Sequence, residues 1–349
     1  MTSRLRRCGV HRISTGTLVV LSLLGWQAPT RAQARQPEAA TPTAPGAAAS
    51  KPRAPAGNDR LAGVALQVSL DRAGFSPGII DGQPGDKTRK ALQLFQQARG
   101  LPPTGTVDEA TREALGTEPP LADYTITAAD VAGPFVERIP DDMMEKRTLD
   151  VLAYTSIAEM LAERFHATPR LLETLNPKTD WAEGTSLQVP NVAPLEIPAN
   201  TETRKVNPPE ADRVADVRVS KAGGMLVVNG VDGRIVFAAP VTSGSEHDPL
   251  PIGKWKVTAV YLRPVFNYSP ELFWDADPSH AKARVPPGPN NPVGLVWIDL
   301  DKEHYGLHGT PEPSRIGVSQ SHGCVRLTNW DALRVAALVK TGTPVLFEP

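Results

Sequence analysis

The sequence predicts a multidomain protein in which a mainly β C-terminal domain, a β-sandwich or barrel-like sheet, follows a small three-helix domain and an α+β segment. Three observations carry this prediction. At 349 residues the chain is longer than one ordinary domain. Two Pro-containing stretches, residues 33–59 and 196–211, interrupt it. Hydrophobic spacing is helical before residue 118 and changes after residue 212 to short runs of β-favouring residues.

Composition excludes several classes of protein. The 37 basic and 38 acidic side chains give a net charge of -1, so the chain lacks the basic excess typical of nucleic-acid binders. Its two cysteines, Cys8 and Cys324, cannot supply a disulfide framework, and no Cys-x-x-Cys pair suggests structural zinc. We therefore expect no nucleic-acid partner and no cofactor.

Residues 1–32 are predicted to be a signal peptide. Several arginines precede an apolar run over residues 18–26, and small residues follow near position 32. The run is shorter than the roughly 20 residues that span a bilayer, which favours export without a permanent membrane span over a retained anchor. Cleavage would also remove Cys8 and leave Cys324 as the single cysteine. Residues 33–59, rich in Ala and Pro, are predicted to be a disordered tether.

Residues 60–118 predict three short helices. The first runs from Leu61 to Gly74, the second begins near Asp86 as a capping residue, and the third follows a capping box formed by Thr106 and Glu109. Periodicity alone establishes only a three-helix bundle.

Short motifs in this unit resemble the peptidoglycan-binding domain type 1 family. They are Ala73-Gly74-Phe75, Ile80-Asp81-Gly82, Thr88-Arg89 and Gly105-Thr106-Val107-Asp108. The resemblance implies a helical module at residues 60–118 that adheres to the peptidoglycan polymer of the cell wall.

Residues 122–195 predict two helices, 156–166 and 168–175, followed by a strand at 186–189. This order is similar to the later part of a LysM glycan-binding module, in which Asn-Pro follows the second helix, as Asn176-Pro177 does here. A first strand at 124–127 would lie about 25 residues before the first helix, which departs from the LysM pattern. An unclassified α+β spacer is the alternative, and residues 196–211 are predicted to be a linker.

Residues 212–349 predict the β domain. Asn-Gly, Asp-Gly and Pro-containing turns separate runs at 217–219, 225–228, 235–237, 254–257 and 295–298. A helix after Asn329, with Leu333, Ala336 and Ala337 inward, precedes a last strand at 344–347.

Cys324 and His308 are the candidates for chemistry in this domain. Acyl transfer by cysteine needs a thiolate, and a free thiol with a pKa of about 8.5 needs a neighbouring base. Gly323 allows a tight turn whose amides could stabilise an oxyanion. The separation from His308 to Cys324 suits two strands or loops that meet in space. A buried structural cysteine and histidine is one alternative, and a metal site that includes His304 and His322 is another.

The motif His308-Gly309-Thr310, with residues 321–327, Asn329 and Asp331, resembles the signature of the YkuD-type L,D-transpeptidase catalytic domain, and residues 285–294 resemble the segment that precedes it. The resemblance implies that Cys324 is the nucleophile and His308 the proton donor and acceptor. By the same resemblance, the supporting residues are His322 and Gly323 at the oxyanion site, Gly309 orienting the imidazole, Ser321 within the motif, and Arg326 holding the loop or a substrate carboxylate.

The resemblance implies an exported, periplasmic, wall-associated enzyme. It would acylate Cys324 with a peptidoglycan tetrapeptide stem, release D-alanine, and transfer the acyl group to an amine of a second stem. Water as acceptor would make it an L,D-carboxypeptidase, and an amine of a wall protein would make it an attachment enzyme. Carbapenem-type β-lactams are expected inhibitors. A non-catalytic peptidoglycan-binding scaffold is the alternative from another class.

Overall fold

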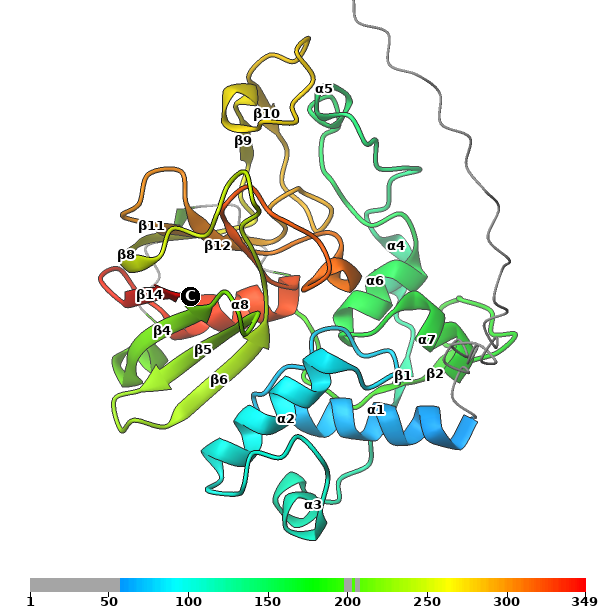
Figure 1. Ribbon diagram of the computed structural model, residues 1–349. Coiled ribbons are helices and arrows are strands. Elements are labelled where there is room, and N and C mark those ends of the chain that lie inside the picture. Colours follow the sequence, from blue (N-terminus) through cyan, green and yellow to red (C-terminus); the bar gives the residue numbers. More distant parts are fainter. Residues whose placement is uncertain (1–56, 198–202, 205–207) are drawn as a thin grey trace, which may run out of the picture. The chain divides into compact units, whose positions relative to one another are not determined.

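The computed structural model describes residues 57–197, 203–204 and 208–349 (Figure 1). The predicted signal peptide and most of the predicted tether lie outside these residues. Helix α1 (Gly57–Arg72) begins inside the stretch predicted to be a tether, so residues 57–59 are helical.

The predicted three-helix unit is present, and the capping residues of two of its helices differ from expectation. Helix α2 (Asp86–Ala98) begins at Asp86, but its N-cap is Gly85, which has no side chain to make a capping bond, and Asp86 pairs with Arg89 and Lys90 inside the first turn. Helix α3 (Glu109–Leu115) is capped by Asp108, which accepts from the Thr111 N–H, and not by a Thr106–Glu109 box. Both differences are local, since more than one polar residue near each start could serve as a cap.

The second unit is a pair of antiparallel strands that flank short helices. The elements are β1 (Leu121–Thr125), α4 (Ala128–Ala132), α5 (Met143–Lys146), α6 (Ile157–Arg164), α7 (Pro169–Leu175) and β2 (Ser186–Pro190). Ser156 and Thr168 cap α6 and α7. The Asn176 side chain bonds the backbone of Leu172 and of Gln188, which ties the end of α7 to β2.

The C-terminal domain is mainly β, and its strands follow one continuous hydrogen-bonded path. Its order is β6-β5-β4-β14-β8-β11-β12-β13-β7, with β3 added beside β8. The ten-residue strand β8 joins the two halves, because it pairs with β14 near its start and with β11 towards its end. The strands are β3 (Thr203–Arg204), β4 (Val214–Ser220), β5 (Met225–Gly230), β6 (Ile235–Pro240), β7 (Thr242–Ser243), β8 (Gly253–Leu262), β11 (Val296–Leu300), β12 (Gly306–His308), β13 (Val325–Arg326) and β14 (Pro344–Glu348).

Strand β3 lies within the predicted linker, so part of that linker joins the sheet. The remaining elements are a separate two-stranded hairpin and three 3-10 turns. They are η1 (Pro209–Arg213), β9 (Phe266–Tyr268), η2 (Pro270–Leu272), β10 (Ala283–Val285) and η3 (Pro313–Arg315).

Helix α8 (Asn329–Leu338) packs against the core of this sheet (Figure 1). Trp330, Val335 and Ala336 are buried in the shared core, as is Val339 just after the helix. Leu333 is half-buried as expected, whereas Ala337 is exposed and not inward. The helix places Trp330 and not Ala337 on its buried face.

The three units share their hydrophobic cores. Residues Phe75 and Ala238 form a bridge between the helical unit and strand β6, and Phe95 of α2 packs in the same cluster as Met225 of β5. On its other side, Val68 of α1 packs with the core of the second unit. Within the described residues, part of the apolar surface of each unit is therefore buried against a neighbouring unit.

A buried ion cluster joins the helical unit to α8. The Asp71 carboxylate, fully buried, accepts two hydrogen bonds from the Arg334 guanidinium at 2.8 and 3.1 Å. His166 Nδ1 lies 3.1 Å from the same carboxylate. Despite the opposing effect of burial, the charges and hydrogen bonds of His166 and Arg334 hold the pKa of Asp71 well below its usual range. The carboxylate is therefore ionised and paired.

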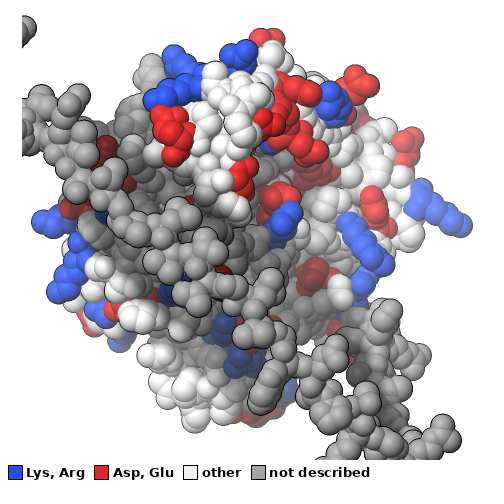
Figure 2. Space-filling view, turned by 45° about the horizontal axis from the view of Figure 1, so that its top comes forward, with Lys and Arg blue, Asp and Glu red and all other residues white. Residues whose placement is uncertain are grey.

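No helix of the described residues is long and apolar enough to cross a bilayer. On the face shown in Figure 2, acidic and basic side chains are interspersed wherever residues are described.

We predict that Arg334→Ala lowers the free energy of unfolding by about 3–5 kcal/mol, because it leaves the buried Asp71 carboxylate without its main partner. Urea denaturation of the full chain measures the loss. Arg112→Ala, which breaks an exposed pair with Glu109, is the matched control and should cost less than about 1 kcal/mol. Equal losses in the two variants would contradict the prediction.

Candidate active site

Two adjacent parallel strands bring His308 and Cys324 to one face of the sheet. In the register of β12 and β13, Leu307 pairs with Val325 and His308 with Arg326. Leu307 and Val325 point into the core. Because side chains alternate along a strand, His308, Arg326 and Cys324, which directly precedes β13, share the opposite face. Residues sixteen positions apart in sequence thus become diagonal neighbours.

The imidazole of His308 is held in one orientation. Its Nδ1 lies 2.7 Å from the carbonyl oxygen of Gly309. A carbonyl only accepts hydrogen bonds, so Nδ1 carries the proton and Nε2 of the neutral ring keeps its lone pair. The ring also stacks on Trp297, its cross-strand partner, with centroids 5.5 Å apart. His308 can therefore accept a proton at Nε2 alone.

Both reactive groups rest in their neutral forms. Burial, together with the positive charge of Arg326, lowers the pKa of His308 to about 3. Burial raises the pKa of the Cys324 thiol to about 11, against the opposing effects of the Gly306 N–H and Arg326. Sγ also lies 3.6 Å from the His304 carbonyl oxygen. The resting pair is a thiol and an imidazole, and charge develops only during a reaction.

The turn before Cys324 has little freedom. Gly323 has φ +91°, and a Cβ there would lie 2.5 Å from the Tyr305 ring. The Ser321 hydroxyl donates to the Cys324 carbonyl at 2.6 Å and accepts from the Gly244 N–H at 2.6 Å. Glycine at 323 and a buried hydroxyl at 321 thus fix the backbone that carries the thiol.

The other two predicted residues border this turn. Arg326 donates to the Gln320 carbonyl at 3.1 Å, and its positive charge lowers the pKa values of both His308 and Cys324. His322 turns its Nε2 towards Asp275, at 2.7 Å, and its ring packs edge-on against Phe273. The segment between β9 and β10 therefore covers His322.

Of the predicted site residues, Ser321, His322, Gly323 and Arg326 lie in the segment that carries Cys324, and the strand register puts His308, which precedes Gly309, on the sheet face that Cys324 shares. The structure adds three that sequence reasoning missed, namely Trp297, Tyr305 and Asp275, because only the strand pairing and the position of the β9–β10 segment bring them in. The three residues share no signal in the sequence, since two are aromatic, one is acidic, and Asp275 lies 33 residues before His308. Among the described residues, no three His, Cys, Asp or Glu side chains are placed to hold a metal ion.

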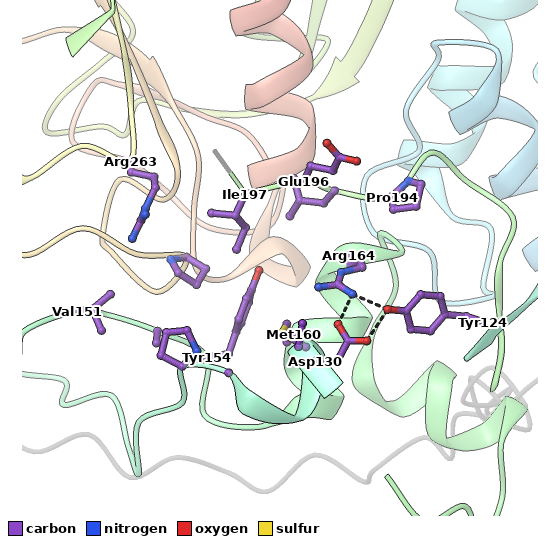
Figure 3. A pocket seen from close by; sticks show the side chains of 16 residues that line it. Tyr124, Asp130, Val151, Tyr154, Met160, Arg164, Pro194, Glu196, Ile197 and Arg263 are labelled. Atoms are coloured by element: carbon purple, nitrogen blue, oxygen red, sulfur yellow. Dashed lines mark hydrogen bonds and ion pairs between the residues drawn. The ribbon is translucent and has the colours of Figure 1, made fainter. Parts of the chain in front are cut away.

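Two hollows lie away from Cys324. The first, about 560 Å³, is bordered by the second unit and by Arg263 and Pro289 of the sheet domain (Figure 3). In it, Arg164 bonds Asp130 and Tyr124, which also bond each other. The second, about 940 Å³, lies between α2 and strands β4 and β5.

A partly exposed cysteine on the same sheet face as an oriented histidine is the arrangement that thiol acyl transfer uses. Comparison with known families agrees. Residues 214–346 match the family described as "L,D-transpeptidase catalytic domain", and residues 64–115 match "Putative peptidoglycan binding domain". The chain thus contains a YkuD-family L,D-transpeptidase catalytic domain, preceded by a peptidoglycan-binding domain. Residues 122–195 lie outside both matches, so their LysM-like character stays a prediction.

The curated relatives match only part of this chain. The "Putative L,D-transpeptidase YkuD" of Bacillus licheniformis is 48% identical over 63 residues, 18% of this chain and 38% of its own. The "Probable L,D-transpeptidase ErfK/SrfK" of Escherichia coli K12 is 30% identical over 166 residues, 39% of this chain and 53% of its own. The chain thus spans well under two thirds of these relatives.

Among solved structures, L,D-transpeptidase 3 of Mycobacterium tuberculosis, in complex with a faropenem-derived adduct, is 19% identical. The match covers 49% of this chain and 77% of that one with a TM-score of 0.33.

We predict that the alkylation rate of Cys324 rises about tenfold per pH unit from pH 7 to beyond pH 9, because the thiol pKa is near 11. Iodoacetamide labelling, followed by mass spectrometry of the Cys324 peptide, measures it. Arg326→Gln should slow labelling at fixed pH, since it removes a charge that favours the thiolate. A plateau already reached at pH 6 would indicate a preformed thiolate and contradict the prediction.

Proposed function

We propose that this protein is an exported, periplasmic, cell-wall L,D-transpeptidase that cross-links peptidoglycan stem peptides. The observation that carries the proposal is the diagonal pairing of Cys324 with a His308 whose Nδ1 is fixed by the Gly309 carbonyl. That arrangement leaves Nε2 to exchange protons with a thiol and with a substrate amine, as two-step acyl transfer requires.

In the first step, the Cys324 thiol gives its proton to His308 Nε2 as sulfur attacks the carbonyl of the third residue of a tetrapeptide stem. The C–N bond then breaks, His308 returns the proton to the departing amine, and D-alanine leaves. A thioester remains on Cys324. The backbone amides of Gly323 and Cys324, with His322, are proposed to stabilise the oxyanion.

In the second step, the acceptor amine loses a proton to His308 and attacks the thioester. The carbon–sulfur bond breaks, and the Cys324 sulfur takes the proton back. If water replaced the amine, the same thioester would be hydrolysed and the protein would be an L,D-carboxypeptidase. An amine of a wall protein would instead give covalent attachment. The neutral resting pair favours none of these acceptors.

The helical unit is proposed to hold the enzyme on peptidoglycan. The support is the match of residues 64–115 to a peptidoglycan-binding domain. Its packing against β5 and β6 would bring polymer close to the catalytic domain. Carbapenem-type β-lactams are proposed inhibitors, because their strained amide offers the Cys324 thiol the same kind of carbonyl as the stem peptide.

We predict that Cys324→Ala abolishes both cross-link formation and D-alanine release, and that His308→Ala lowers both by at least about a hundredfold. Mass spectrometry of disaccharide-tetrapeptides incubated with the full chain measures the products. Binding to sacculi and the thermal unfolding midpoint of Cys324→Ala should match those of the parent. Cross-linking that persists in Cys324→Ala would refute Cys324 as the nucleophile, whereas a parent protein that binds sacculi but forms no cross-links would favour the scaffold alternative.

A further inference from the structure

Helix α6 of the second unit reaches into the loops that carry the catalytic histidine. Its residues Glu159 and Glu163 are four positions apart and therefore lie on the same face. Glu159 accepts a hydrogen bond from the Asn290 amide at 2.8 Å, and Glu163 accepts one from the Asn329 amide at 2.6 Å. Both asparagines belong to the catalytic domain, whereas both glutamates lie outside the range that matches its family.

Asn329 is central to the loops around His308. Its Nδ2 donates to the Pro289 carbonyl at 3.2 Å as well as to Glu163, and its Oδ1 accepts from the Leu295 N–H at 2.9 Å. The amide therefore ties the 285–295 loop to the start of α8.

The same Oδ1 fills the space beside two glycines. A Cβ at Gly309 would lie 2.2 Å from it, and a Cβ at Gly294 would lie 2.0 Å from it. The Asn329 amide thus touches the backbone of Gly309, whose carbonyl accepts from His308 Nδ1 at 2.7 Å. A displaced Asn329 amide would free that peptide to rotate and the imidazole to turn with it.

We propose that Glu163 is a positioning residue for His308, acting through the Asn329 side chain and the Gly309 peptide. The proposal rests on the proposed function for its effect on turnover, but the orientation of His308 can be measured without any reaction. It also gives the second unit a role that needs no glycan ligand.

The protonation state of Glu163 makes the strength of its hydrogen bond with Asn329 depend on pH. Burial, with a smaller effect from the Glu159 charge, raises the pKa of Glu163 to about 7, and the hydrogen bonds from Asn329 and Tyr154 oppose that rise. Above this pH both donors face a carboxylate, and hydrogen bonds to a charged acceptor are the stronger ones. The hydrogen bond from Asn329 to Glu163 therefore becomes stronger as the pH rises through about 7.

Nitrogen-15 NMR of the histidine rings in the full chain tests the positioning directly, with the His308 signal assigned from His308→Ala. The parent, Glu163→Gln and Glu173→Gln should all show the Nδ1-protonated tautomer. Glu173 is an exposed carboxylate of α7 and serves as the matched control. Glu163→Ala should give mixed tautomers. A single Nδ1-protonated tautomer in Glu163→Ala would overturn the proposal.

Kinetics of cross-linking give the second measurement. Glu163→Ala should lower kcat about tenfold with KM within about twofold, and should add nothing in a His308→Ala background. Glu163→Gln should keep kcat near that of the parent but lose the inflection near pH 7. An unchanged kcat in Glu163→Ala, or an equal further loss in the His308→Ala background, would overturn the proposal. Parent protein without cross-linking activity would refute the proposed function, while the tautomer result would still decide the role of Glu163.

Discussion

The start of helix α8 is the point at which the three units of this chain are tied together. Asn329 bonds Glu163, the Trp330 ring stacks on His166 with centroids 5.0 Å apart, and Asp331 accepts from the Ser76 hydroxyl at 2.9 Å. One turn later, Arg334 pairs with Asp71. Thr328, which caps α8, lies only four residues after Cys324. The geometry of the catalytic turn is therefore coupled to the packing of both preceding units.

Burial is the largest influence on the pKa values of the charged residues around the start of α8 and of Cys324 and His308. It raises the pKa of Asp331 to about 7, whereas nearby Asp71, equally buried, is held ionised by the Arg334 guanidinium and the hydrogen bond with His166. In the site, burial pushes the pKa values of Cys324 and His308 away from each other. In the proposed mechanism, the proton would therefore move from Cys324 to His308 only as the substrate approaches. Precise placement of the imidazole then matters more than a preformed charge pair.

Because the hydrophobic cores are shared, the helical unit and the second unit are not independent modules joined to the sheet domain by linkers. In a chain of separate modules joined by linkers, wall binding and catalysis would be connected only by proximity. Here the peptidoglycan-binding domain packs on strand β6 and on the second unit at once. The second unit in turn contacts the loop at 285–295 through Asn290. Polymer bound by one unit would therefore be presented at a fixed position relative to the catalytic domain.

Local signals in the sequence were enough to predict the secondary structure of most elements and to single out Cys324 and His308 as the candidate reactive pair. Periodicity located α1, α2, α6 and α7, and the motif around Cys324 indicated the residues that surround it, because these signals are local in the chain. Tertiary structure alone decided the caps at Gly85 and Asp108, the exposure of Ala337 and the continuity of the sheet through β8. It also decided the contact between Glu163 and Asn329, which are 166 residues apart. Such a contact leaves no periodic trace in the sequence, since it depends on how separately formed elements pack.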